Sequence, residues 1–226
     1  MRALPMHIEL VDSLRCPHPH EDTWLVASVT RFDGRDIVQG MLGCPVCRRQ
    51  YVVQEGEVDF TAGRDPRPAV RRDADEREAA PPGPIDHDEL LRARAVLALG
   101  EAGGIVMLGG THAQLAAALA DEAQVAPLLL NPPDWARDGG RFPSALRVDD
   151  VLPLAGGVLR AAWLDAATAT SPLLAATVRA LRPGGRLVAP ARCALPAGVT
   201  ELARDGHEWV AESTAVSSAP VSLRRR

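Results

Sequence analysis

The residues best suited to chemistry lie in the first 50 positions, where three of the four cysteines are found. Cys44-Pro45-Val46-Cys47 is a tight knuckle that presents two thiolates at the spacing used by tetrahedral zinc sites. About 28 residues upstream, Cys16-Pro17-His18-Pro19-His20 adds a third sulfur and two imidazoles. Three sulfurs and one imidazole make a closed structural site with no position for a substrate. We predict structural Zn²⁺ bound by Cys16, His20, Cys44 and Cys47, with His18 as the alternative fourth ligand.

Other uses of these thiols are less consistent with the sequence. Four cysteines in a chain without a secretory signal favour metal or reduced thiols over disulfides. A redox pair at Cys44 and Cys47 would normally open a helix within a βαβ unit, whereas these residues lie between expected strands. Cys193 is distant in sequence, and we interpret it as a core thiol rather than a nucleophile.

Short runs of alternating apolar and polar residues surround the cluster between about residues 8 and 60. Such alternation is typical of strands. The pair Asp33-Gly34 favours a tight turn, so residues 23–42 are predicted to form a hairpin. The hairpin would lie between Cys16 and the knuckle in the sequence. Because its second strand returns toward the start of the first, Cys16 and the knuckle could bind the same ion. We predict a small β-rich domain over residues 1–62.

The character of the chain changes twice after this domain. Residues 63–84 are charged and rich in proline, which predicts a linker. Residues 85–226 then alternate helical and apolar segments, a pattern typical of a parallel sheet covered on both faces. We expect helices over 86–100, 113–123 and 171–181, and strands over 105–108, 127–130, 145–148, 157–164, 185–189, 208–212 and 221–224.

The N-terminal motifs resemble a known family. Leu14-Arg15-Cys16-Pro17, the run from Leu42 to Val53 and the segment from Glu55 to Val58 are similar to the small zinc-ribbon proteins that activate methyltransferases. The likeness covers about the first 60 residues. It implies a structural zinc ribbon that binds a methyltransferase subunit and stabilises it.

The C-terminal motifs carry a second resemblance. The segment from Leu181 to Pro190, with its Arg-Pro-Gly-Gly turn, is similar to the region before the fifth strand of class I S-adenosylmethionine-dependent methyltransferases. Leu152-Pro153-Leu154 and the following strand to Asp165 resemble the third and fourth strand region of that family. The likeness spans about residues 86–226. It implies an α/β fold with a Rossmann-like sheet, helices on both faces and S-adenosylmethionine as cofactor.

Several of the residues expected to bind that cofactor are replaced in this chain. The turn after the first strand retains Gly109 and Gly110, but Met107 stands where the resemblance places an acid. Asn131 replaces the carboxylate that would bind the ribose hydroxyls, and an amide forms a weaker bond than a charged group.

Four further side chains are candidates at this site. Asp149 or Asp150 remains available for the adenine and Asp165 for the acceptor side, although each acid is equally suited to capping a helix or facing solvent. His112 follows the glycines and could serve as a base, but a single histidine in a turn is more often a cap or a surface residue.

Composition narrows the functional classes. The net charge of −4 disfavours binding to nucleic acid, and the absence of lysine excludes Schiff-base chemistry and a phosphate-loop lysine. No apolar run approaches the ~18 residues that span a bilayer, so we expect a cytoplasmic protein without membrane segments.

Three functional hypotheses remain. The first is a methyltransferase-like pseudoenzyme that acts by binding a protein partner or a second copy of itself. The alternatives are an active S-adenosylmethionine-dependent methyltransferase and a nucleic-acid-binding zinc ribbon.

Overall fold

The computed structural model describes residues 6–61, 83, 85–136 and 144–216. The expected linker, 63–84, lies outside the described residues apart from Gly83. The same holds for the strand expected at 221–224. The boundaries of the two expected domains therefore stay predictions.

The N-terminal part is mostly strands, as its alternating pattern predicts. One short helix, α1 (Ile8–Val11), precedes the hairpin. The turn between the hairpin strands places Gly34 at φ +64°, a conformation that glycine adopts without strain. The strands of this part are β1 (Met6–His7), β2 (Val26–Asp33), β3 (Asp36–Gly43), β4 (Gln50–Gln54) and β5 (Glu57–Asp59).

The C-terminal part alternates helices and strands. Two of its helices begin with the side-chain caps that their sequences favour: Asp86 accepts from the main-chain N–H of Glu89, and Thr170 from that of Leu173. The helices are α3 (His87–Val96), η1 (Gly110–Leu115), α4 (Ala116–Ala123), η2 (Asp134–Ala136) and α5 (Ser171–Ala180). The strands are β6 (Ile105–Gly109), β7 (Ala126–Leu130), β8 (Ser144–Arg147), β9 (Leu159–Trp163), β10 (Leu181–Pro190), β11 (Val199–Arg204) and β12 (Glu208–Ser213).

Strand order confirms the expected α/β fold class. In the C-terminal part the order is β8-β7-β6-β9-β10-β12-β11, with β6 to β10 parallel and β12 antiparallel to β10. This is a Rossmann-like sheet in which the first strand in sequence lies at the centre and a hairpin closes one edge. The hairpin partner of β12 is β11, which the polar sequence of residues 199–204 did not reveal.

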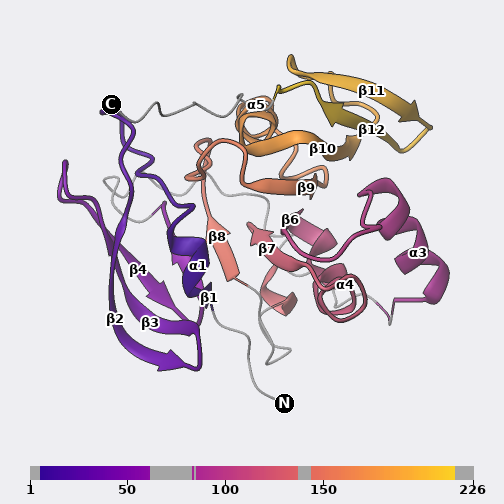
Figure 1. The fold of residues 1–226 in the computed structure, drawn as a ribbon. Helices are drawn as coiled ribbons and strands as arrows, with labels where there is room; N and C mark the ends of the chain where they lie inside the picture. Colours follow the sequence, from indigo (N-terminus) through magenta and orange to yellow (C-terminus); the bar gives the residue numbers. More distant parts are fainter. Residues whose placement is uncertain (1–5, 62–82, 84, 137–143, 217–226) are drawn as a thin grey trace, which may run out of the picture.

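The N-terminal strands continue this sheet. Strand β5 pairs in parallel with β8, so that Glu57, Val58 and Asp59 lie opposite Ala145, Leu146 and Arg147. Main-chain bonds extend the pairing at both ends, from Ala145 N to Gly56 O and from Phe60 N to Arg147 O. All twelve strands of the described residues therefore belong to one sheet. In Figure 1 the N-terminal strands β2 to β4 lie on the left and the hairpin of β11 and β12 at the upper right.

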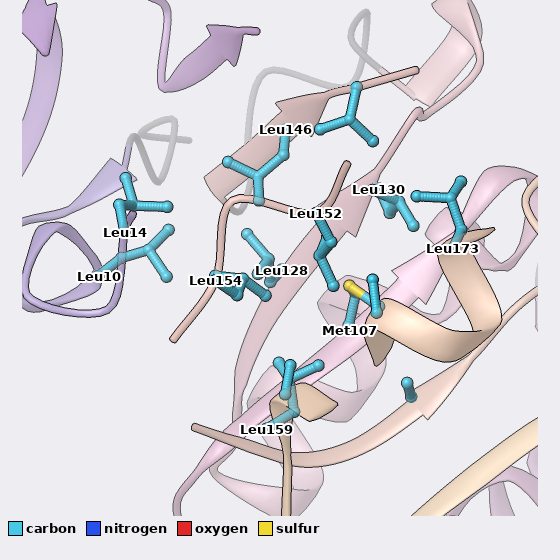
Figure 2. Close-up of a cluster of buried hydrophobic side chains, with 14 of the residues drawn as sticks. Leu10, Leu14, Met107, Leu128, Leu130, Leu146, Leu152, Leu154, Leu159 and Leu173 are labelled. Carbon is cyan, nitrogen blue, oxygen red and sulfur yellow. The ribbon is translucent and has the colours of Figure 1, made fainter. Parts of the chain in front are cut away.

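Alternation along the central strands divides the apolar side chains between two faces. Val106 and Leu108 of β6 pack with α3 and α4 in one cluster, whereas Met107 faces the opposite cluster. Met107 is fully buried there and lies near Leu130, Leu152 and Leu173 (Figure 2). The position where the resemblance places an acid therefore points into an apolar core.

The N-terminal segment covers part of that second face. Leu10 and Leu14 are buried in the same cluster as Leu128 and Leu146 of the central sheet (Figure 2). Leu14 and Leu154 form an antiparallel bridge between the two parts. We call residues 6–61 of the structure the ribbon. The strands of the ribbon and the parallel strands thus share one hydrophobic core.

Leu14→Ala tests this shared core. The side chain is fully buried, so its truncation should lower the free energy of unfolding by about 2–5 kcal/mol. Urea denaturation monitored by circular dichroism should still show one transition. Leu91→Ala, at a leucine that is 46% exposed in α3, is the matched control and should cost under about 1 kcal/mol. Two separate transitions for Leu14→Ala would contradict a common core.

Candidate functional site

The four predicted metal ligands come together where the turn between β3 and β4 meets the segment before β2. The Sγ atoms of Cys16, Cys44 and Cys47 and a ring nitrogen of His20 all lie within 4.8 Å of one another. Cys16 Sγ and Cys47 Sγ are 3.7 Å apart, and Cys44 Sγ is 3.3 Å from His20 Nε2. A tetrahedron with zinc–sulfur bonds of about 2.3 Å has edges of about 3.8 Å. The donor set therefore fits a zinc ion in size and in chemistry.

The surroundings of the cluster favour metal binding. His20 Nδ1 lies 2.6 Å from the carbonyl oxygen of Glu21, a contact that holds the proton on Nδ1 and leaves Nε2 free to bind a metal. Burial alone would raise the pKa of Cys44, but main-chain N–H groups of Cys47 and Val46 lower it to about 7. A thiol of lowered pKa more readily becomes the thiolate that a metal requires. His18 lies outside the set of four.

The glycine turn after β6 is closed by the chain itself. A Cβ atom on Gly109 would collide with the side chains of Thr168 and Leu164. Gly110 has φ +57°, and a Cβ there would collide with the carboxylate of Asp165. Close packing against the turn after β9 accounts for both glycines without a ligand.

Asp165 joins this turn to its neighbour. Its Oδ2 accepts from the main-chain N–H and the hydroxyl of Thr111, at 2.9 and 3.2 Å. Its Oδ1 accepts from Thr168 Oγ1 at 2.7 Å and from the main-chain N–H groups of Thr168 and Ala167. A carboxylate offers about four lone-pair sites, so these five donors occupy both oxygens. Asp165 therefore has little capacity left for a substrate.

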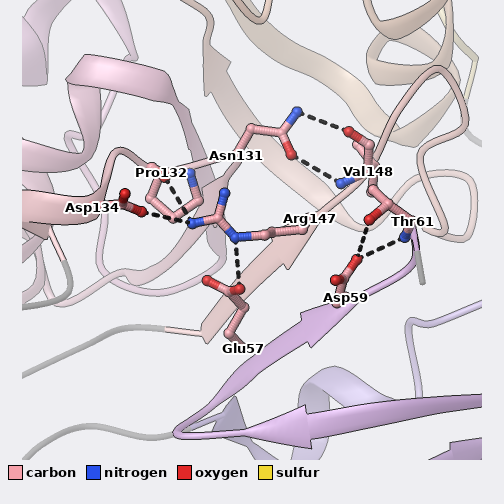
Figure 3. Close-up of polar contacts among 8 residues, drawn as sticks. All are labelled: Glu57, Asp59, Thr61, Asn131, Pro132, Asp134, Arg147 and Val148. Atoms are coloured by element: carbon pink, nitrogen blue, oxygen red, sulfur yellow. Dashed lines mark hydrogen bonds and ion pairs between the residues drawn. The ribbon is translucent and has the colours of Figure 1, made fainter. Parts of the chain in front are cut away.

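Asn131 is engaged in a similar way. Its amide nitrogen donates to the carbonyl of Val148 at 3.0 Å, and its amide oxygen accepts from the N–H of Val148 at 2.9 Å (Figure 3). The two bonds imitate a strand pairing across the ends of β7 and β8. The residue at the expected ribose position thus uses one N–H and its oxygen to bind the backbone of Val148.

Asp149 and Asp150 lie at a boundary between the two parts of the chain. Both are exposed and line a hollow of about 70 Å³. Ribbon residues form the other wall, among them His18, Arg49 and Tyr51. The other residues predicted to contact the cofactor do not line this hollow: Gly109, Gly110, Asn131 and Asp165.

His112 caps no helix and is half-buried, whereas a single histidine in a turn is expected to be a cap or a surface residue. Its ring stacks on Trp163 with 4.6 Å between the ring centroids. Burial lowers the pKa of His112 to about 4, with the charge of Asp165 opposing the shift and that of Arg92 adding to it. The ring is neutral near pH 7 and packs as an aromatic group.

Several residues of this region could not be recognised from the sequence. Thr168 fills the space beside Gly109, and Arg147 binds Glu57 of the ribbon at 2.7 Å (Figure 3). Tyr51 places its hydroxyl 3.5 Å from Cys16 Sγ. A threonine three residues after an acid is a recognisable turn signal, but nothing local indicated the partners of Arg147 and Tyr51.

Strand order and the ligand cluster together define the class of this protein. It is an α/β protein with a Rossmann-like sheet, which carries an N-terminal Cys₃His cluster suited to a metal. None of the described helices has the length and apolar character needed to cross a bilayer.

Comparisons with known proteins find only weak similarity to solved structures. No family model and no curated protein sequence matches the chain. The antibiotic-resistance methyltransferase Kmr shares 18% identity at a TM-score of 0.39, over 56% of this chain and 93% of its own. A chain from a complex of the Haloferax volcanii Trm112 methyltransferase activator with a methyltransferase shares 24% identity at a TM-score of 0.35. The match covers 43% of this chain and 50% of its own.

A geranyl diphosphate methyltransferase bound to S-adenosylmethionine gives 17% identity and a TM-score of 0.37, over 45% of this chain and 48% of its own. The chain thus spans about half the length of this enzyme and of the Haloferax volcanii match. Scores this low add nothing to the fold assignment, which rests on the strand order.

Metal analysis tests the ligand assignment. We expect about one zinc per purified chain, lost in Cys44→Ser and in His20→Ala. His18→Ala is the matched control, because its ring lies beside that of His20 at 6.1 Å but outside the cluster. It should retain the metal. Inductively coupled plasma mass spectrometry measures the content, and loss in His18→Ala with retention in His20→Ala would reverse the assignment.

His112 should make stability depend on pH. A histidine whose pKa falls from 6.5 to about 4 on folding stabilises the native state above pH 6.5, and this contribution disappears as the pH falls toward 4. Between pH 7.5 and 5 the loss should be ~2 kcal/mol. His112→Phe keeps an aromatic ring on Trp163 and removes the titration.

The difference between the free energies of unfolding of the native chain and His112→Phe should therefore change over this pH range. Urea titrations at each pH measure it. A constant difference would show that folding leaves the pKa of His112 unchanged.

Proposed function

We propose that this chain is a methyltransferase-like protein that no longer binds the cofactor and that acts by binding a protein partner. In this proposal the former cofactor-binding positions stabilise the fold. The proposal rests mainly on Asp165, whose two carboxylate oxygens accept five hydrogen bonds from the turns after β6 and β9. Thr168 and Asp165 fill the space directly beside Gly109 and Gly110, and we infer that a nucleoside bound there would have to displace them.

The environment of Met107 and Asn131 supports the same proposal. Met107 faces an apolar core in which a carboxylate would be costly to bury without a partner. Asn131 holds β7 against the end of β8 through both of its amide atoms. Met107, Asn131 and Asp165 therefore each have a stabilising role of their own.

Exposed apolar residues on the ribbon support a binding role. The outer face of β2, β3 and β4 carries Val26, Met41 and Val52, which are 62%, 36% and 57% exposed. The strand register places Met41 directly opposite Val52, and Val26 two residues from the partner of Met41. Contiguous exposed apolar side chains are typical of surfaces that contact another protein. The Cys₃His cluster, holding zinc, would keep this surface in shape.

Titration calorimetry with S-adenosylmethionine tests the proposal on the full chain. We expect no binding with a Kd below about 1 mM, because the ligand would have to open the Asp165 contacts. As a second readout, 1 mM ligand should leave the Tm unchanged. A ligand at 100 times its Kd would stabilise the native state by about 2.7 kcal/mol and raise the Tm. Micromolar binding would sink the proposal.

The second candidate is an active S-adenosylmethionine-dependent methyltransferase. The complete strand order and the two exposed acids after β8 favour it. Gly109→Val cannot separate the candidates, since the added side chain collides with Thr168 whether or not a cofactor binds. Asp149→Asn and Asp150→Asn are better variants. Each should weaken S-adenosylmethionine binding if this candidate holds, and neither side chain is buried.

A further inference from the structure

We propose that the Cys₃His cluster controls how firmly two turns at the carboxyl edge of the parallel sheet are held. These edge turns are residues 131–134, after β7, and residues 148–155, after β8. Each is joined to the ribbon by a separate set of contacts, and both sets lead back to ligands of the cluster. The inference does not depend on whether the edge binds a nucleoside.

The first connection runs through the main chain next to Cys16. Ser13 O accepts from Ala155 N at 2.8 Å, and Arg15 N donates to Pro153 O at 2.9 Å, on either side of the Leu14 to Leu154 bridge. No helix lies between β8 and β9, so residues 148–158 have no regular element of their own. The bridge is one of the contacts that order them, beside the burial of Leu152 and Leu154 in the core. On the ribbon side it is followed directly by Cys16, a predicted metal ligand.

The second connection runs from the knuckle through β4 and β5. Cys44 N donates to Arg49 O at 2.9 Å, and β4 begins at the next residue. Strand β4 pairs with β5, which carries Glu57. Glu57 Oε1 accepts from Arg147 Nε at 2.7 Å, and the two side chains are 20% and 25% exposed.

Arg147 completes this connection at the first edge turn. Its second guanidinium nitrogen lies 3.3 Å from the carbonyl of Pro132 and 3.5 Å from Asp134 (Figure 3). A planar guanidinium that contacts three groups fixes their relative positions better than a flexible ammonium would. Arg147 is therefore a positioning residue that ties the turn after β7 to the ribbon.

Removal of the metal would affect both connections. Closed zinc sites supply much of the folding free energy of small domains, so the segments that carry Cys16 and the knuckle lose their fixed geometry without it. Strands β6, β9 and β10 are held by apolar clusters that α3, α4 and α5 cover. Local opening should therefore reach the edge turns before it reaches the central strands.

Hydrogen exchange followed by mass spectrometry tests the proposal on the full chain. The chain is compared as purified and after treatment with a zinc chelator. Exchange in peptides covering residues 131–136 and 148–158 should become at least about tenfold faster without metal, and exchange in β6 and β10 should stay within about twofold. Cys47→Ser should reproduce the pattern. Cys193→Ser, whose sulfur lies outside the cluster against the carbonyl of Ala169, should not.

A second pair of variants separates the two connections while the metal stays bound. Glu57→Gln should speed exchange at residues 131–136 about threefold or more and leave the metal content unchanged. Glu55→Gln removes a comparable pair with Arg31 on the exposed side of the ribbon and should change neither. Edge turns that exchange equally with and without metal would overturn the proposal. So would an equal acceleration in β6 and β10, or no response to Glu57→Gln.

Discussion

Parallel pairing between β5 and β8 is the constraint on which the rest of the structure depends. A strand at the edge of a sheet exposes unpaired main-chain groups, and pairing with another segment satisfies them. Here the ribbon supplies that segment within the same chain, over three residue pairs and two further main-chain bonds. Everything N-terminal to β5 is thereby fixed relative to the parallel sheet, including the Cys₃His cluster.

This arrangement explains how so few helices can cover the sheet. One face has α3 and α4, but the other has α5 and the N-terminal segment that carries Leu10 and Leu14. These leucines occupy apolar surface that would otherwise contact water, in the region where no helix follows β8. The ribbon is therefore part of the hydrophobic core of the protein.

In the proposed function, the carboxyl edge keeps the outline of a cofactor site while its side chains take other roles. Asp165, Asn131 and the two glycines stand where a cofactor would be contacted, yet each is engaged by neighbouring backbone or side chains. Buried and half-buried polar groups require hydrogen-bond partners, and a chain can provide them as well as a ligand can. Under this proposal, the hydrogen bonds of Asp165 and Asn131 stabilise the edge rather than hold a small molecule.

Sequence alone determined those features that depend on local chemistry. The knuckle at Cys44 and Cys47, the turn at Asp33-Gly34 and the apolar strands that form β6 and β7 each follow from residue types at short spacing. They set the α/β class and brought together the four candidate ligands on either side of a hairpin.

Only the tertiary structure decided which groups meet across long stretches of the chain. Glu57 reaches Arg147 across 90 positions, Asp165 closes on Thr111 across 54, and Leu14 packs beside Leu154. The polar strand β11 likewise became a strand because β12 offered it an edge. Such contacts depend on how strands align in space, and residue patterns fix the face of a strand without fixing its neighbour.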